Sequence, residues 1–331
     1  MEYYLGVDVG SVSSDFVLLD KKHNVISKLY LKTQGQPIRV IKDGLKLLRD
    51  KMPSDGCVAA VGTTGSGRDL AGVMVGADIV KNEITAHAVA TLERVPDVST
   101  ILEIGGQDSK MIIIRDGIVT DFAMNTVCAA GTGSFLDRQA GRLGIPIEQF
   151  GEMALKSTTK VRIAGRCAVF AESDMIHKQQ MGYDPEDIIN GLCEALVRNY
   201  LNNVGKGKEI LPKVVFQGGV AANVGIKHAF EEALNCEIYV PEHHEIMGAI
   251  GAAILAQEAV ESKGRTNFRG FDLVDMDFKT KSFDCNGCAN QCEVVQIVAD
   301  SEIVARWGDR CGKWHNALQK KKQRDADKAM A

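Results

Sequence analysis

Two apolar strands flank a polar turn in the segment that decides the fold, Tyr4-Leu-Gly-Val-Asp-Val-Gly-Ser-Val-Ser-Ser-Asp-Phe-Val-Leu-Leu-Asp20. Gly10 permits the tight turn because it has no side chain, and the serines that follow, Ser11, Ser13 and Ser14, add hydroxyl donors. Residues 25–31 are expected to complete a meander as a third strand, and residues 38–49 have the apolar spacing of a helix. The segment therefore predicts the start of an α/β unit with a polar turn.

The same pattern returns after residue 100. We expect a strand at Ile101-Leu-Glu-Ile104, a turn at Gly105-Gly-Gln-Asp-Ser109 and a second strand at residues 110–115. Asp116-Gly117 is a strong hairpin signal, so residues 118–122 are expected to form a third strand. This internal repeat predicts an α/β fold with two similar halves, at residues 1–98 and 99–262, around a cleft.

A third glycine turn, Gly218-Gly-Val-Ala-Ala-Asn223, follows the strand expected at residues 213–217. Glycine turns after strands can bind phosphate, because backbone N–H groups approach it closely. Asp8 and Asp108 lie at the ends of the first two turns, where two carboxylates facing across a cleft can hold Mg²⁺, largely through water. The P-loop pattern is missing, and Gly131-Thr-Gly-Ser-Phe-Leu136 lacks the third glycine of a dinucleotide fingerprint.

Two cysteines each stand just before an expected helix, in Cys128-Ala-Ala-Gly-Thr-Gly-Ser-Phe-Leu-Asp137 and in Cys167-Ala-Val-Phe-Ala-Glu-Ser-Asp174. Unpaired N–H groups at a helix N-terminus favour negative charge, which suits a reactive thiolate or a ligand of an anionic metal cluster. A cubane cluster takes four thiolates, and a two-fold dimer would supply the other two. The alternative is that both are ordinary buried cysteines.

The sequence changes character after residue 262, and we expect a separate Cys-rich extension at residues 263–331. Its four cysteines, Cys285, Cys288, Cys292 and Cys311, form a complete ligand set whose spacing matches no ferredoxin type. They could bind an iron–sulfur cluster, structural zinc or nothing. Residues 320–328 are basic and are expected to form a solvated helix end or tail.

We expect the remaining cysteines and the histidines to have structural rather than functional roles. The apolar neighbours of Cys57, Cys193 and Cys236 predict core positions. His87, His177 and the pair His243-His244 are expected to be structural or surface residues rather than ligands.

Composition narrows the class of protein. The chain has 331 residues, 45% hydrophobic and 25% charged, which is typical of globular proteins, and a net charge of −4 that does not favour nucleic-acid binding. The N-terminus lacks a signal-peptide pattern, and the longest apolar run, residues 246–256, is too short to span a membrane. Nine cysteines without an export signal predict thiols or metal ligands in a cytoplasmic protein.

Three motifs resemble the superfamily of sugar kinases, actin and heat-shock chaperone ATPases: Val7-Asp-Val-Gly-Ser11, Glu103-Ile-Gly-Gly-Gln-Asp108 and Phe216-Gln-Gly-Gly-Val-Ala-Ala-Asn223. The resemblance implies ribonuclease H-like halves with ATP and Mg²⁺ between them. Residues implied at the phosphates are Gly10, Ser11 and Ser13 or Ser14, with Asp8 and Asp108 at Mg²⁺. Gly105, Gly106, Gln107 and Asp108 would lie near the γ-phosphate and the attacking water, with Gln107 and Asp108 catalytic. Gly218, Gly219, Val220 and Asn223 would lie near the adenosine. Many members have a lysine where this chain has Asp15.

Both cysteine motifs, in register with the nucleotide motifs, resemble one branch of that superfamily, the BcrA/BadF/BadG/HgdC-type ATPases. This branch contains activators of 2-hydroxyacyl-CoA dehydratases, ATPase subunits of benzoyl-CoA reductases and reductases of double-cubane cluster proteins. The resemblance implies a homodimer in which Cys128 and Cys167 of both chains hold one [4Fe–4S] cluster. It also implies that ferredoxin or flavodoxin donates electrons, which ATP hydrolysis drives to a partner iron–sulfur enzyme.

The sequence therefore predicts an ATPase coupled to electron transfer. The alternative is a small-molecule kinase, with Asp108 as its base, or a nucleotide-switched binding protein with structural zinc. The partner enzyme and its substrate do not follow from the sequence.

Overall fold

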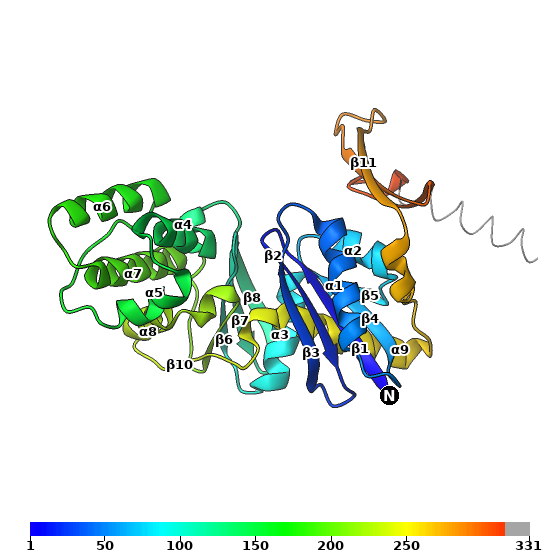
Figure 1. Ribbon diagram of the computed structural model, residues 1–331, viewed down its shortest axis with the longest axis horizontal. Coiled ribbons are helices and arrows are strands. Elements are labelled where there is room, and N and C mark those ends of the chain that lie inside the picture. The colour runs from blue at the N-terminus through cyan, green and yellow to red at the C-terminus, as the bar shows by residue number, and fades with distance from the viewer. Residues whose placement is uncertain (315–331) are drawn as a thin grey trace, which may run out of the picture.

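The computed structural model describes residues 1–314 and has two five-stranded sheets side by side and a small third sheet (Figure 1). The basic run at residues 320–328 lies outside the described residues. None of the helices within residues 1–314 has the length and apolar character needed to cross a membrane.

The first half contains one sheet in the order β3-β2-β1-β4-β5. Its strands are β1 (Glu2–Val9), β2 (Ser13–Leu19), β3 (Val25–Lys32), β4 (Cys57–Thr64) and β5 (Ile79–Val80). Its helices are α1 (Pro37–Lys51), α2 (Arg68–Val75) and α3 (Glu83–Arg94). Strands β1 to β3 form the predicted antiparallel meander, and β4 pairs with β1 in parallel.

The second half repeats this topology in the order β10-β9-β6-β7-β8. Its strands are β6 (Thr100–Ile104), β7 (Ser109–Arg115), β8 (Ile118–Asn125), β9 (Val214–Gln217) and β10 (Ile238–Tyr239). Its helices are α4 (Gly133–Leu143), α5 (Ile147–Ala154), α6 (Ala168–Gln180), α7 (Pro185–Asn203), α8 (Val224–Leu234) and α9 (Met247–Lys263). Each strand of one sheet has a counterpart in the other, so the predicted duplication is confirmed.

Helices α3 and α9 join the two halves. Ile84 and Ala88 of α3 pack against the second sheet, whereas α9 packs on β1, β4 and α3 of the first half (Figure 1). The small residues of α9 make this possible: a side chain at Gly251 would meet the Ala86 carbonyl, and one at Gly6 would meet the Ala249 carbonyl. These small residues therefore let α9 pack closely on β1 and α3.

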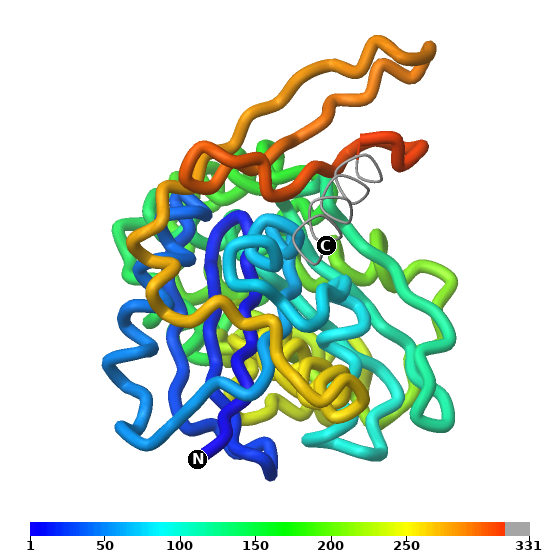
Figure 2. The backbone as a smooth tube through the Cα atoms, turned by 90° about the vertical axis from the view of Figure 1, so that its right-hand side faces the viewer, coloured from blue at the N-terminus to red at the C-terminus, as the bar shows by residue number. Residues whose placement is uncertain are grey.

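The extension after α9 comprises the 3₁₀ helix η4 (Phe271–Asp275) and an antiparallel sheet of β11 (Phe278–Asp284), β12 (Glu293–Ala299) and β13 (Glu302–Trp307). Leu273, Phe278, Ile297 and Ala299 belong to the core cluster that also contains α1 and α2. Asp78 attaches the connecting segment, because its carboxylate accepts the Asn267 N–H at 2.6 Å. The extension therefore packs on the first half (Figure 2).

Cys193 is buried, as predicted, and Cys236 is partly buried. The prediction for Cys57 is wrong, because this residue is exposed. It is the first residue of β4, where the side chain points away from the core before the buried run of the strand begins.

Candidate nucleotide cleft and cysteine loops

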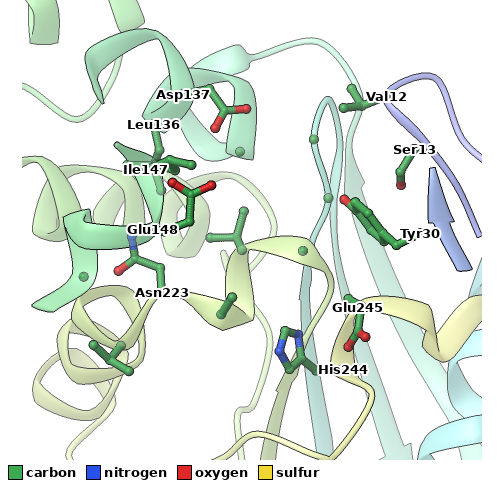
Figure 3. Close-up of a pocket in the computed structure, with 18 of the residues that line it drawn as sticks. Val12, Ser13, Tyr30, Leu136, Asp137, Ile147, Glu148, Asn223, His244 and Glu245 are labelled. Atoms are coloured by element: carbon green, nitrogen blue, oxygen red, sulfur yellow. The ribbon is translucent and has the colours of Figure 1, made fainter. Parts of the chain in front are cut away.

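A cavity of about 960 Å³ lies between the two halves. Figure 3 shows Ser13 and Tyr30 of the first half on one side, with Asp137, Glu148 and Asn223 of the second half opposite. Six residues predicted to contact nucleotide line it: Ser13, Gly105, Gly106, Gly219, Val220 and Asn223. The cavity therefore brings together parts of all three glycine turns. The other predicted residues do not line it: Asp8, Gly10, Ser11, Ser14, Gln107, Asp108 and Gly218.

Several lining residues were not predicted from the sequence. Lys28 and Tyr30 come from β3, and His243, His244 and Glu245 come from the segment before α9. These residues reach the cavity only through packing of segments far apart in the chain, so no local pattern marks them. The histidine pair, predicted to be structural or surface residues, lies on the cavity wall; His244 also contacts the third turn, through Nδ1 and the Gly218 carbonyl at 3.0 Å.

The first two glycine turns have the same geometry. Gly10 N–H donates to the Ser13 carbonyl at 2.8 Å, and Gly105 N–H donates to the Asp108 carbonyl at 3.0 Å. Ser14 is fully buried, and its hydroxyl bonds with that of Thr33 at 2.8 Å. Ser13, which lines the cavity, is therefore the better placed of these two serines to contact phosphate.

Lys110, on β7, is the centre of a buried charge cluster beside the cleft. Its ammonium group lies 2.7 Å from Glu83, 3.0 Å from Glu103 and 2.9 Å from Asp108. Only Asp108 was predicted to be functional; Glu83 reaches the cluster from α3, in the other half, and left no local signal in the sequence. Asp108 is thus already paired with a cation, which disfavours it as the base of a kinase.

Asp8 of β1 and Asp15 of β2 are paired across the first turn. In the second half the corresponding positions hold Glu103 and Lys110. Burial, together with the charges of Glu83 and Asp108, raises the pKa of Asp8 to about 7 despite the opposing charge of Lys110. Burial and the charge of Asp8 raise the pKa of Asp15 well above its ordinary value. The position where many superfamily members have a lysine therefore holds a carboxyl group that favours its neutral form.

Burial also raises the pKa of Glu103 to about 7, and Lys110 only partly offsets this effect. The region thus gathers four carboxyl groups around the buried Lys110, those of Asp8, Glu83, Glu103 and Asp108, and Asp15 lies beside Asp8. Carboxylates are the ligands that Mg²⁺ prefers, and a divalent cation would relieve their mutual repulsion. The carboxyl groups therefore have the chemistry to bind Mg²⁺ through water, although no three of them are grouped closely enough to hold a bare ion within residues 1–314.

Cys128 lies in a loop that Asn125 organises. The Asn125 amide oxygen accepts the Cys128 N–H at 2.9 Å, and its amide nitrogen donates to the Cys128 carbonyl at 2.8 Å. The buried Asn199 of α7 then links the two cysteine loops, donating to the Gly165 carbonyl at 2.5 Å and lying 3.8 Å from the Cys128 sulfur. The loops before α4 and α6 are therefore held together.

Cys167 is the N-cap residue of α6, and Cys128 precedes the short helix that leads into α4. Both thiols are partly exposed, so neither is an ordinary core cysteine. Exposed apolar residues lie near both cysteines in the chain: Val127 is 94% exposed, Val169 68% and Phe170 67%. Large exposed apolar residues are typical of a surface that binds a partner.

The first turn of α4 is bonded directly to the second glycine turn. Gly133 N–H donates to the Gly105 carbonyl at 2.9 Å, and Ser134 N–H donates to the Gly106 carbonyl at 2.8 Å. The Ser134 hydroxyl bonds with the Gly106 carbonyl as well. Since Cys128 lies five residues before Gly133, the cavity wall and the cysteine loop are joined by a short, hydrogen-bonded segment.

The extension cysteines lie around one end of the third sheet. Within residues 1–314, no three His, Cys, Asp or Glu side chains are grouped closely enough to hold a metal ion. The possible second metal site therefore remains a prediction.

Comparison with known proteins identifies related chains. A model of the BadF/BadG/BcrA/BcrD ATPase family matches residues 5–256. The (R)-2-hydroxyglutaryl-CoA dehydratase activating ATPase of Acidaminococcus fermentans is 37% identical over 262 residues, which cover 77% of this chain and 96% of that protein. A benzoyl-CoA reductase subunit of Thauera aromatica is 26% identical over 263 residues, covering 75% and 91% respectively.

Solved structures give the same result. The activator of the 2-hydroxyisocaproyl-CoA dehydratase from Clostridium difficile with bound ADPNP has a TM-score of 0.72 and 33% identity, and the match covers 79% of this chain and 97% of that one. Component A of the Acidaminococcus fermentans (R)-2-hydroxyglutaryl-CoA dehydratase has a TM-score of 0.70 and 34% identity, covering 78% and 100%. With the two repeated sheets, these neighbours confirm the predicted duplicated α/β fold of the actin-like ATPases.

Proposed function

Since the chain belongs to the BadF/BadG/BcrA/BcrD ATPase family, we propose that it is an ATP-dependent activator of a partner iron–sulfur enzyme of the 2-hydroxyacyl-CoA dehydratase or double-cubane type. ATP binding and hydrolysis would drive electrons from ferredoxin or flavodoxin to that enzyme. The observation that carries the proposal is the link between the cleft and a pair of helix-start cysteines, because a kinase requires no such pair.

The cleft supports a division of roles among the nucleotide residues. Ser13, Gly105 and Gly106 would contact the phosphates, and Gly218, Gly219, Val220 and Asn223 would surround the adenosine. Asp8 and Asp108 would hold Mg²⁺, and the exposed Gln107 is free to orient the attacking water. ADPNP in the Clostridium difficile activator supports nucleotide binding in a chain with this fold.

Cys128 and Cys167 fit a [4Fe–4S] cluster shared between two subunits. Their thiols are partly exposed, their loops are joined by Asn199, and the N-terminus of α6 favours negative charge at Cys167. When bound, the cluster would supply low-potential one-electron transfer. Two such thiolates per chain leave a cubane cluster half-liganded, so a homodimer completes the set.

The apolar surface supports the same homodimer. Val127 lies beside Cys128, and Val169 and Phe170 lie just after Cys167, so burying them would also shield the thiolates from water. A two-fold axis close to the cysteine loops would place this surface against its own copy.

Nucleotide binding would reach the cysteines through α4. If Gly105 and Gly106 move toward the phosphates, the hydrogen bonds to Gly133 and Ser134 oblige the start of α4 to follow. For ATP to favour one arrangement it must bind the two arrangements with different affinity. The shared hydrogen bonds would transmit such a preference from the turn to the start of α4, because they make the position of the turn depend on that of the helix.

Iron and acid-labile sulfide, measured on anaerobically purified protein, test the proposal. We expect Cys128→Ala and Cys167→Ala each to lose about two irons per chain relative to wild type. Cys57→Ala removes an exposed thiol from another surface and should keep the wild-type iron content. Undiminished iron in both cluster variants would refute the shared cluster and leave an ATPase without a redox role.

A further inference from the structure

The extension is absent from the part of the chain that the relatives match. The family model ends at residue 256, and the Acidaminococcus fermentans ATPase is 96% covered by 77% of this chain. Residues 276–314 contain only one small sheet, whose buried apolar residues are Phe278, Val294, Ile297 and Ala299. Phe278, Ile297 and Ala299 belong to the core cluster of the first half, so the opposite end of the sheet has little apolar core of its own, and small units of that kind commonly need a metal or disulfides.

The antiparallel topology brings the cysteines to one end of this sheet. Asp284 pairs with Glu293, and the next pair is formed by Cys285 and Cys292, whose N–H and carbonyl bond at 2.8 Å. Cys288 lies in the loop between them, where the Gln291 N–H donates to its carbonyl at 3.3 Å. One loop thus carries three thiols.

Cys311 approaches the same loop from β13. Val295 pairs with Trp307, so the chain leaves β13 at the end of the sheet where the loop lies. The Trp314 ring then packs edge-on against Phe283, with centroids 4.9 Å apart, so the segment after β13 returns to the end of β11 that leads into the loop. A Cβ atom added at Gly287 would lie 3.2 Å from the Lys313 Nζ and 3.5 Å from the Cys285 Sγ, so the segment after β13 reaches the loop beside Gly287.

We propose that Cys285, Cys288, Cys292 and Cys311 bind one zinc ion as four thiolates. Cys288 and Cys311 are exposed, and no three of the four thiols are grouped closely enough to hold an ion in this structure, so zinc binding would draw Cys288 and Cys311 toward Cys285 and Cys292. A closed four-thiolate site is a structural zinc site, and it would tie the loop to the segment after β13. The position of the extension also favours a structural ion over an electron carrier, because it packs on the first half, whereas Cys128 and Cys167 belong to the second. This site is independent of the proposed electron transfer.

The test is zinc and iron content of the full chain, purified anaerobically and dialysed against a weak chelator. We expect about one zinc per chain in wild type and in Cys57→Ala, and at least a tenfold loss in Cys288→Ala and Cys311→Ala. Cys311→His supplies another zinc ligand and should retain the ion. X-ray absorption at the zinc edge of wild type should give four sulfur neighbours at about 2.3 Å.

Three results would overturn the proposal. One is wild-type protein without zinc, including protein in which these thiols are oxidised to disulfides. Another is zinc that persists in both alanine variants. The last is iron and sulfide that disappear with Cys311, which would make the site an iron–sulfur cluster. Loss of iron in Cys128→Ala is a separate readout, so this proposal and the proposed function can fail independently.

Discussion

Lys110 is a buried ammonium group whose side chain is 3% exposed and contacts three carboxylates from both halves. The corresponding pair of strands in the first half carries Asp8 and Asp15. Asp8 corresponds to Glu103 and Asp15 to Lys110, so the first half has a carboxyl group where the second half has a lysine. Lys110 therefore offsets the negative charge of carboxylates from both halves, and a bound Mg²⁺ ion would offset the charge that remains.

Replacing Lys110 with Met should be severely destabilising. The change leaves Glu83, Glu103 and Asp108 without their buried partner, and breaking a buried pair in this way costs about 3–5 kcal/mol of unfolding free energy. Urea denaturation without nucleotide measures this. Lys213→Met, which breaks an exposed pair with Asp97, should leave stability within error. Equal effects for the two variants would show that the cluster does not hold the halves together.

Asp8 gives a pH dependence of stability. Its pKa of about 7 in the folded protein lies above the ordinary value of 3.8, so the folded state holds an extra proton between those pH values. Stability from this group is complete below about pH 4 and is lost as pH rises through 7, with a slope of at most about 1.4 kcal/mol per pH unit.

The Asp8→Asn variant has a neutral side chain at every pH, so it cannot ionise. In Mg²⁺-free buffer the variant should therefore match wild type near pH 4 and exceed it in denaturant midpoint at pH 8. Added Mg²⁺ at pH 8 should stabilise wild type more than the variant. Parallel stability curves across this pH range would show that Asp8 is not buried among like charges.

At the scale of elements, the repeat and the glycine turns could be predicted because strand periodicity and turn residues are local in sequence. The contacts of α4 could not. Ser134 and Gly106 are 28 residues apart, and their hydrogen bond exists only because α4 begins against the second turn. Glu83 was missed for the same reason, since α3 brings it from the first half to Lys110 in the second. Cys57 shows the opposite error, in which apolar neighbours suggested burial at an exposed strand end.

Gly133→Val tests the junction between α4 and the cleft. A side chain at Gly133 would press on the Gly105 carbonyl, 3.1 Å from an ideal Cβ, and on Val220 at 3.0 Å, and so displace parts of two nucleotide turns. Calorimetry should give at least a tenfold loss of affinity for an ATP analogue. Gly141→Val lies on the same helix in open space and should bind within twofold of wild type. Normal binding by the Gly133 variant would mean that α4 and the nucleotide turns are independent.

At the scale of the whole molecule, the repeated halves form the cleft and the second half carries the cysteine surface. Phe170→Asp would place a charge in the proposed dimer contact, and we expect a monomer with little iron in sedimentation analysis at micromolar concentration. Leu47→Asp adds the same charge at an exposed apolar residue of α1 and should remain dimeric. A dimer that survives the Phe170 change would place the contact between the two copies elsewhere.

The central claim is that nucleotide binding in the cleft changes the environment of the cysteine loops through α4. The most direct test is the electron paramagnetic resonance spectrum of anaerobic, dithionite-reduced protein, recorded with MgADP and then with a non-hydrolysable ATP analogue. The account predicts an iron–sulfur signal whose shape or midpoint potential differs between the two nucleotides in wild type but not in Gly133→Val, with both proteins saturated with nucleotide. Identical spectra and potentials in wild type, with nucleotide binding verified by calorimetry, would contradict it.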